Sequence, residues 1–229
     1  MNNMILSQMF ETLWENNQFI KAIWETIYLT IISTLFAYVI GLPLGVILNI
    51  TSKNGIKANK WLNAILSFIV NIFRSIPFII LMVAVLPVSK LIVGTSLGNK
   101  AMIVTLVIAA APYFARMVES SLKEVDYGVV EAAKSMGASN WQIIYKVLLP
   151  EAKPSLVVGA VISIVTVIGY TAMASTIGGG GLGALAIIYG HQRGNSDIIW
   201  FCVLLIVIIV QVIQELGMLL SRKIDKRIK

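Results

Sequence analysis

The chain has 229 residues, of which 58% are hydrophobic and 13% are charged, and its formal net charge is +7. An average soluble domain carries about 25% charged residues, and here Asp, Glu, Lys and Arg are missing from the stretches 26–52, 154–192 and 198–214. Because about 20 apolar helical residues span a bilayer core, the composition predicts an all-α polytopic membrane protein. It excludes a soluble enzyme, a disordered chain and a secreted disulfide scaffold.

Five transmembrane helices are expected in chain order, at about 22–50, 61–87, 100–123, 154–175 and 198–220. Residues 1–15 lack Lys and Arg, so the first apolar run is expected to stay as a membrane span and not to be cleaved as a signal. The sequence shows no internal repeat and no soluble domain at either end. Residues 1–229 are therefore expected to form a single transmembrane domain.

Lys and Arg in the connections predict the orientation. Most of the 18 basic residues lie at 53–60, at 116–153 and after residue 221, whereas Lys21, Lys90, Lys100 and Arg193 lie on the other side. Cytoplasmic connections carry the excess of Lys and Arg. The N-terminus is therefore expected outside and the C-terminus in the cytoplasm, which an odd number of spans requires.

Glycine and proline interrupt several of the expected spans. The first contains Gly41 and Gly45 around Pro43, the second contains Pro77, and the third contains Pro112. Breaks in membrane helices are tolerated where other helices or a water-filled cavity satisfy the freed backbone groups. We interpret the glycine–proline motif as a packing kink that lets a neighbouring helix approach, although several breaks in one small protein also fit a moving pathway.

A glycine-rich stretch follows the fourth span, where five of the six residues 178–183 are glycine. Such a run cannot hold a helix at low cost. The apolar piece 184–190 that follows is too short to span a bilayer, so it is expected to be re-entrant or interfacial. The stretch itself is either a flexible element at the mouth of a pathway or a plain connection.

The longest polar stretch lies between the third and fourth spans. Asp126 can cap a helix that ends before Gly137, where a left-handed residue is needed. Ser139 and Gln142 then have the spacing of a capping box, which starts a second helix that is expected to end near Pro150. The sequence predicts two short helices joined by a glycine turn, either docked into a groove of a partner or lying on the bilayer.

This segment resembles the EAA loop of ABC-importer permease subunits. In that loop, a Glu-Ala-Ala motif is followed by a glycine and a Leu-Pro pair. The loop would extend over about 124–153, and the resemblance implies a docking site for a cytoplasmic ATPase formed by Glu131, Ala132, Ala133, Gly137, Leu149 and Pro150. The scarcity of Lys and Arg on the first helix also argues against a helix lying on the bilayer.

Four further blocks, at 70–78, 92–98, 110–119 and 169–173, look like the methionine-importer permeases of the type I ABC-importer family. This resemblance implies a homodimer with two ATPase subunits and an extracytoplasmic methionine-binding lipoprotein, in the cytoplasmic (inner) membrane of a bacterium. It implies import of D- or L-methionine by alternating access, with ATP and Mg²⁺ on the ATPase and no cofactor on this chain. Import of another small amino acid is the alternative.

Few polar residues could face a pathway. Arg74, next to Ser75, lies about 20 Å along a helix from Trp61, so it either lines a cavity, pairs with carbonyls opened by Pro77, or snorkels. Late in the fourth span, Tyr170, Thr171 and Met173 could line a route for a thioether substrate, and ordinary packing is the alternative.

Other functions fit less well. Arg116 and Glu119 have the spacing of an ion pair on one helix face, which we interpret as structural. A stand-alone secondary transporter would need coupling-ion groups inside its spans, and these are few. No constellation of catalytic or metal-ligating residues is apparent, so the chain is expected to be non-catalytic.

Overall fold

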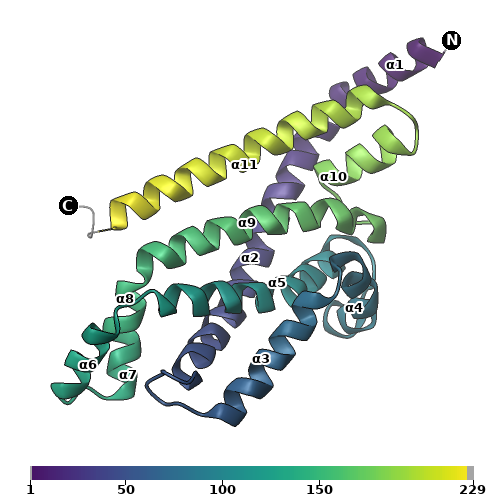
Figure 1. Ribbon diagram of the computed structural model, residues 1–229. Helices are drawn as coiled ribbons and strands as arrows, with labels where there is room; N and C mark the ends of the chain where they lie inside the picture. Colours follow the sequence, from purple (N-terminus) through teal and green to yellow (C-terminus); the bar gives the residue numbers. More distant parts are fainter. Residues whose placement is uncertain (1, 226–229) are drawn as a thin grey trace. The chain divides into compact units, whose positions relative to one another are not determined.

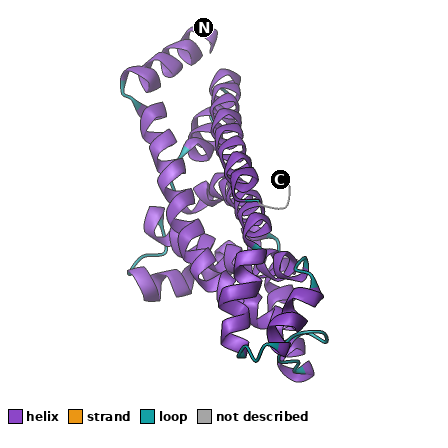
Figure 2. Ribbon diagram, turned by 90° about the vertical axis from the view of Figure 1, so that its left-hand side faces the viewer, coloured by secondary structure: helices purple, strands orange, loops and turns teal. Residues whose placement is uncertain are grey.

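The computed structural model describes residues 2–225, with side chains from Gln8 onward, and all of the regular elements in that range are helical (Figures 1 and 2). Within residues 2–225, four helices are long and apolar enough to cross a membrane: α2 (Gln18–Thr51), α5 (Gly98–Lys123), α9 (Lys153–Ala174) and α11 (Ser196–Ile224). A broken pair would make a fifth span, α3 (Lys60–Ser75) with α4 (Phe78–Val93). The predicted all-α membrane fold is confirmed.

The second expected span, 61–87, is interrupted at Pro77, as the proline within it suggested, and consists of two helices. Helix α3 stops at Ser75, Ile76 is extended with φ −80° and ψ 125°, and α4 begins at Phe78. Pro77 causes this break because proline lacks an N–H donor and disfavours helical backbone in the residue before it. By contrast, Pro43 and Pro112 lie inside the continuous helices α2 and α5.

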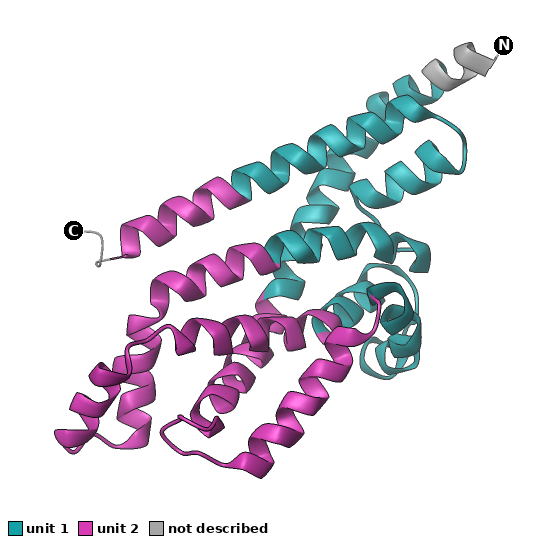
Figure 3. Ribbon diagram, viewed as in Figure 1, with its two compact units in different colours: residues 1–34, 78–107, 164–213 teal, residues 35–77, 108–163, 214–229 magenta. Residues whose placement is uncertain are grey.

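The chain divides into two compact units, each assembled from separate segments (Figure 3). Unit 1 comprises residues 1–34, 78–107 and 164–213, and unit 2 comprises residues 35–77, 108–163 and 214–229. Each long helix contributes residues to both units. The single membrane domain over the whole chain and its orientation both stay predictions. The orientation depends partly on residues that lie outside the described range, namely Lys226, Arg227 and Lys229.

Unit 1 holds an aromatic cluster where three helices meet. The ring of Phe19 in α2 contacts Phe10 of α1 (Asn2–Glu15) and Phe201 of α11, with centroids 5.4 Å and 4.8 Å away. Cys202 is fully buried in the same core, so it packs as a small apolar side chain. The short helical piece 182–191, α10 (Leu182–Leu185) followed by the turn η3 (Ala186–His191), packs here too, and as predicted it is too short to span.

The glycine-rich stretch of unit 1 is not a free loop. Gly178 and Gly181 have positive φ angles of 74° and 102°, which favour glycine. The backbone N–H groups of residues 180–182 donate hydrogen bonds to side chains of α2 and α5. The stretch is therefore bonded to two long helices in this structure, and its role at the mouth of a pathway stays a prediction.

Unit 2 is built around close contact between α2 and α5. A Cβ added at Gly41 would lie 2.6 Å from the Cβ of Phe114, and one added at Gly45 would lie 2.5 Å from the carbonyl oxygen of Ala115. Real Cβ atoms do not approach other atoms this closely, so only glycine fits at either position. The prediction that these glycines allow a close helix approach is confirmed.

Candidate functional site

The polar segment after α5 folds as the predicted helical hairpin. Helix α6 (Tyr127–Ser135) is capped by Asp126, whose Oδ1 accepts a hydrogen bond of 2.6 Å from the N–H of Gly128. Gly137 follows with φ +80°, the left-handed conformation that ends such helices. Ser139 and Gln142 form the expected capping box, with hydrogen bonds of 2.9 and 3.4 Å, and start α7 (Asn140–Ile143).

The second helix continues from α7 to just past its predicted end. A π-helical turn, η1 (Ile144–Leu148), follows α7, and α8 (Leu149–Glu151) completes it. The N–H of Leu149 reaches back five residues to the carbonyl of Ile144. Pro150 stands in the first turn of α8, a position where its missing N–H does little harm.

One face of the hairpin is buried in the core of unit 2. Val130 and Ala133 of α6 are 6% exposed each, and they pack in a cluster with Ile143, Leu148 and Leu122. The cluster also includes residues of α5 and α9, so it joins the hairpin to the two long helices that flank it in sequence (Figure 1). Movement of the hairpin would therefore be transmitted to α5 and α9 through packed side chains.

The six residues of the predicted docking site do not share one environment. Glu131, Ala132, Gly137 and Pro150 are exposed, and Leu149 is half-buried against the core cluster. Ala133 is buried, because it lies three residues after buried Val130 on the inner face of α6. We therefore correct its role from a docking position to a core position that supports the hairpin.

Large apolar side chains are exposed on the hairpin. Tyr127, Met136, Trp141 and Tyr145, here called the hairpin tip residues, are 60%, 83%, 73% and 66% exposed. Several exposed large apolar side chains on one short segment indicate an interaction surface. Sequence reasoning named Met136 as available for contacts but missed the other three residues, although Trp141 next to a predicted helix start was a signal.

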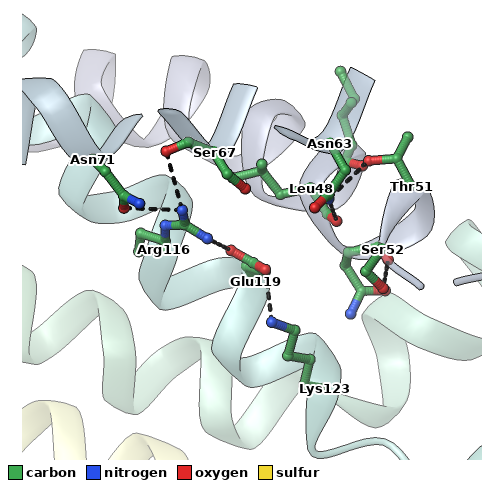
Figure 4. Close-up of polar contacts among 11 residues, drawn as sticks. Leu48, Thr51, Ser52, Asn63, Ser67, Asn71, Arg116, Glu119 and Lys123 are labelled. Atoms are coloured by element: carbon green, nitrogen blue, oxygen red, sulfur yellow. Dashed lines mark hydrogen bonds and ion pairs between the residues drawn. The ribbon is translucent and has the colours of Figure 1, made fainter. Parts of the chain in front are cut away.

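An ion-pair network ties α5 to α3 in unit 2 (Figure 4). Glu119 is 4% exposed and accepts hydrogen bonds from Arg116 and, at 2.7 Å, from Lys123. Arg116 also donates to the Oδ1 of Asn71 at 3.0 Å and to the backbone carbonyl of Ser67 at 3.3 Å. The predicted Arg116–Glu119 pair is confirmed as a structural pair, and its reach to α3 was not expected.

A second polar link joins α3 to the end of α2. The side-chain amide of Asn63 donates to the carbonyl of Leu48 at 2.8 Å and to the hydroxyl of Thr51 at 3.1 Å (Figure 4). Asn59 caps the start of α3 by accepting a hydrogen bond of 3.0 Å from the N–H of Leu62. With the ion-pair network, these bonds hold α3 against both α2 and α5.

Arg74 occupies the last turn of α3, before the break, and its side chain is exposed. Its guanidinium carbon lies 5.9 Å from the centroid of the Tyr113 ring in α5, within the range of a cation–π contact. Ser75 is also exposed, and its hydroxyl donates to the carbonyl of Asn71 in its own helix. The guanidinium of Arg74 thus has the Tyr113 ring as a partner, so pairing with backbone carbonyls opened by Pro77 is not needed to explain its position.

Of the three residues predicted late in the fourth span, Met173 is exposed, Tyr170 is half-buried and Thr171 is buried. The ring of Tyr170 stacks on the ring of Phe78 with a centroid distance of 4.3 Å and an interplanar angle of 3°. Met173 is 49% exposed and shares a helix face with exposed Gly169. Thr171 is buried and donates to the carbonyl of Ile168 in its own helix, so it is not placed to line a pathway.

Phe78 was not predicted as a site residue. It is the first residue of α4, directly after Pro77, and it is buried. The break in the helix therefore places an aromatic ring against α9. Its position after the proline was the only available signal in the sequence.

A cavity of about 780 Å³ lies in unit 2 between the α2–α3 connection and α6. Its lining includes Lys53, Asn54, Ile56, Tyr127 and Val130. In residues 2–225, no group of three or more His, Cys, Asp or Glu side chains is placed to hold a metal ion. The arrangement offers surfaces for docking and packing.

Comparison with known families matches residues 41–229 to the binding-protein-dependent transport system inner membrane component family. This chain belongs to that family. It is thus an inner membrane component of a transport system, and the expected multi-pass membrane location is confirmed. The match covers the hairpin, the ion-pair network and the Phe78–Tyr170 stack.

Individual relatives and a solved structure show which members of the family this chain resembles. The probable D-methionine transport system permease protein MetI of Vibrio cholerae is 50% identical over 208 residues, which are 91% of this chain and 92% of the relative. The methionine import system permease protein MetP of Bacillus subtilis is 48% identical over 222 residues, 96% of this chain and 100% of the relative. A chain in a structure of the MetNI methionine ABC transporter in inward-facing conformations is 46% identical, with a TM-score of 0.89, 90% of this chain and 96% of that chain being covered. The resemblance seen in the sequence is confirmed for this permease family.

Proposed function

We propose that the chain is the membrane-spanning permease subunit of an ATP-driven ABC importer that moves methionine, in its D or L form, into the cytoplasm. The observation that carries the proposal is near full-length similarity, at about half identity, to permeases named for methionine transport. The fold supports it, since a chain of a methionine ABC transporter has the same architecture. The permease itself performs no bond chemistry in this proposal.

The assembly we propose contains a second copy of this chain, two cytoplasmic ATPase subunits that hold ATP and Mg²⁺, and an extracytoplasmic methionine-binding lipoprotein. The N-terminus lies outside and the hairpin and C-terminus lie in the cytoplasm. The hairpin tip residues support docking of the ATPase, because Met136 and Trp141 expose large apolar side chains beside Glu131. Gly137 keeps the turn between the two helices tight.

Coupling would pass from the hairpin into the spans through unit 2. The ATPase, on binding ATP, shifts the permease between two states by contacting the hairpin differently in each. The core cluster around Val130 and Leu122 joins the hairpin to α5 and α9. The Arg116–Glu119 network then joins α5 to α3. Helices α5, α9 and α3 thus respond to one docking surface.

The pathway we propose passes the exposed face of α9 that carries Gly169 and Met173. A thioether and an aromatic ring make favourable contacts with sulfur-containing ligands, and the stacked Tyr170–Phe78 pair supplies the ring edge. Arg74 and Ser75 at the end of α3 are further candidates, because both are exposed. Thr171 is left out because its side chain is buried.

Competition between substrates tests the proposed specificity. In vesicles that contain the complete complex, unlabelled L-methionine and D-methionine are expected to compete with labelled methionine. Leucine, glutamine and histidine at the same concentration are expected not to compete. Equal competition by any of these other amino acids would show that the machinery imports a different or broader set of substrates.

A further inference from the structure

The glycine-rich stretch is fastened through its backbone to side chains that lie far away in the sequence. The N–H of Gly180 donates to the Oδ1 of Asn99 in α5 at 2.8 Å. The N–H of Gly181 donates to the Oε2 of Glu25 in α2 at 2.9 Å. All of these residues belong to unit 1. The two bonds join two consecutive amides to two different helices.

A third bond extends the same row. The N–H of Leu182 donates to the hydroxyl oxygen of Thr26 at 2.9 Å, and that hydroxyl in turn donates to the carbonyl of Ala22 at 2.9 Å. Thr26 is 2% exposed, so the bond is shielded from water. The side chain of Asn99 also shares a hydrogen bond with Tyr28. Three consecutive amides are thus held by three side chains, two of which, Thr26 and Asn99, have a further partner of their own.

The glycines in this stretch serve close packing. A Cβ added at Gly179 would overlap the side chain of Met102, which is fully buried, and one added at Gly180 would overlap the carboxylate of Glu25. One added at Gly183 would overlap the backbone of Ala172 in α9. Side chains at these three positions would lie in space that α5, α2 and α9 already fill.

Glu25 is the unusual member of this arrangement. It directly precedes the charge-free stretch 26–52 and is half-buried. A carboxylate in such an environment is costly unless its charge meets good hydrogen-bond donors. A carboxylate accepts a stronger hydrogen bond from a backbone N–H than a neutral acceptor does. These facts indicate that Glu25 serves as the hydrogen-bond acceptor for the Gly181 amide, which an apolar residue at this position could not do.

We propose that Glu25, with Thr26 and Asn99, forms a clasp that makes the glycine stretch and the end of α9 move as one body with α2 and α5. Glu25 is thus a positioning residue for transport. The face of α9 with Tyr170 and Met173 lies only a few residues before the clasped stretch, so the clasp fixes that face relative to α2. This inference rests on the proposed transport function for its consequence, although the clasp itself does not depend on it.

Amide hydrogen exchange tests the clasp directly. The full-length chain in its purified complex, in lipid nanodiscs, is compared as wild type, Glu25→Ala and Glu25→Gln. Exchange in peptides that cover residues 178–183 is expected to rise about fivefold in Glu25→Ala, the size expected for one lost hydrogen bond. Glu25→Gln is expected to restore most of the protection, because the amide oxygen of Gln still accepts the bond from Gly181, although less strongly than the carboxylate.

The matched control is Glu15→Ala, which removes an exposed carboxylate of unit 1 outside the clasp. It is expected to leave exchange at 178–183 unchanged. If Glu25→Ala does not yield a folded complex, Thr26→Val and Asn99→Ala replace it, and they are expected to raise exchange at Leu182 and Gly180. Unchanged exchange in the folded clasp variants would overturn the proposal, as would equal exchange in the Gln and Ala variants.

A transport measurement tests the positioning role. The number of methionine molecules imported per ATP hydrolysed is expected to fall at least about threefold in Glu25→Ala and to be restored in Glu25→Gln, consistent with loss of one hydrogen bond. A ratio unchanged in Glu25→Ala would contradict that role. Failure of the proposed function would look different, since the wild-type complex would then import no methionine while the exchange result would still stand.

Discussion

The ring of Phe78 lies parallel to the ring of Tyr170, with centroids 4.3 Å and planes 3° apart. Phe78 begins α4 directly after the break at Pro77, and Tyr170 lies late in α9. The stack therefore holds the start of α4 against α9, the helix that carries the proposed pathway face. Both residues belong to unit 1.

Replacing Phe78 with Leu is expected to weaken both stability and import. Leu keeps most of the apolar contact but removes the stacked ring, which is worth about 1 kcal/mol beyond buried area. The melting temperature in detergent is expected to fall by about 2–4 °C. The neighbouring change Ile79→Leu, at a 47% exposed position, is the control and is expected to have no effect. Identical melting of both variants would contradict a stabilising stack.

Replacing Trp141 with Ala is expected to weaken ATPase binding while leaving the permease folded. Trp141 is 73% exposed, so its removal leaves no cavity in the core. A central aromatic residue of an interface contributes about 2 kcal/mol or more, which corresponds to at least about a thirtyfold weaker dissociation constant. The measurement is the affinity of the purified ATPase for the permease in detergent.

Trp61→Ala is the matched control for this change. Trp61 is 81% exposed but lies at the start of α3, outside the hairpin. ATPase affinity is expected to be the same as in wild type. If both tryptophan variants bind the ATPase as tightly as wild type does, the hairpin tip is not the docking surface.

Replacing Gly137 with Ala is expected to strain the turn between α6 and α7. Gly137 has φ +80°, and a Cβ there would meet no neighbour, so the cost arises from the backbone alone. That cost is about 1–2 kcal/mol. ATP hydrolysis is expected to become less well coupled to import. Gly159→Ala, inside α9 with ordinary contacts, is the control and is expected to be neutral or slightly stabilising. Normal coupling in Gly137→Ala would argue against a required left-handed turn.

Removing the carboxylate of Glu119 is expected to destabilise unit 2. Glu119→Ala leaves Arg116, which is 21% exposed, without its buried partner, and the loss of a hydrogen bond to a charged group of this kind costs about 1.5–3 kcal/mol. Glu119→Gln keeps an acceptor for one bond and is expected to cost less. Thermal unfolding measures the difference, with exposed Glu124→Gln as the control. Equal melting of Glu119→Ala and wild type would contradict a structural ion pair.

Features that depend on neighbouring residues could be predicted from the sequence. The capping box of Ser139 and Gln142 and the Arg116–Glu119 pair both use partners three residues apart, so helix geometry alone brings them together. Long apolar runs likewise gave four of the spans. Pro77 marked a break, but the sequence does not say that the helix restarts as α4 instead of kinking.

Features that depend on distant partners could not be predicted. The bonds that hold Gly181 and Leu182 reach residues 156 positions away, so composition alone could not separate a flexible stretch from a packed one. The stack of Phe78 on Tyr170 and the bond from Arg116 to Asn71 likewise depend on tertiary packing. The burial of Ala133 depends on which face of α6 meets the core.

Accumulation of labelled methionine in vesicles is the measurement that tests the central claim most directly. The complete complex, with this chain, its ATPase and the binding protein, is expected to concentrate methionine when ATP and Mg²⁺ reach the ATPase. Accumulation is expected to stop without ATP. Accumulation without ATP or without the ATPase, or none at all in the complete complex with ATP, would contradict an ATP-driven methionine permease.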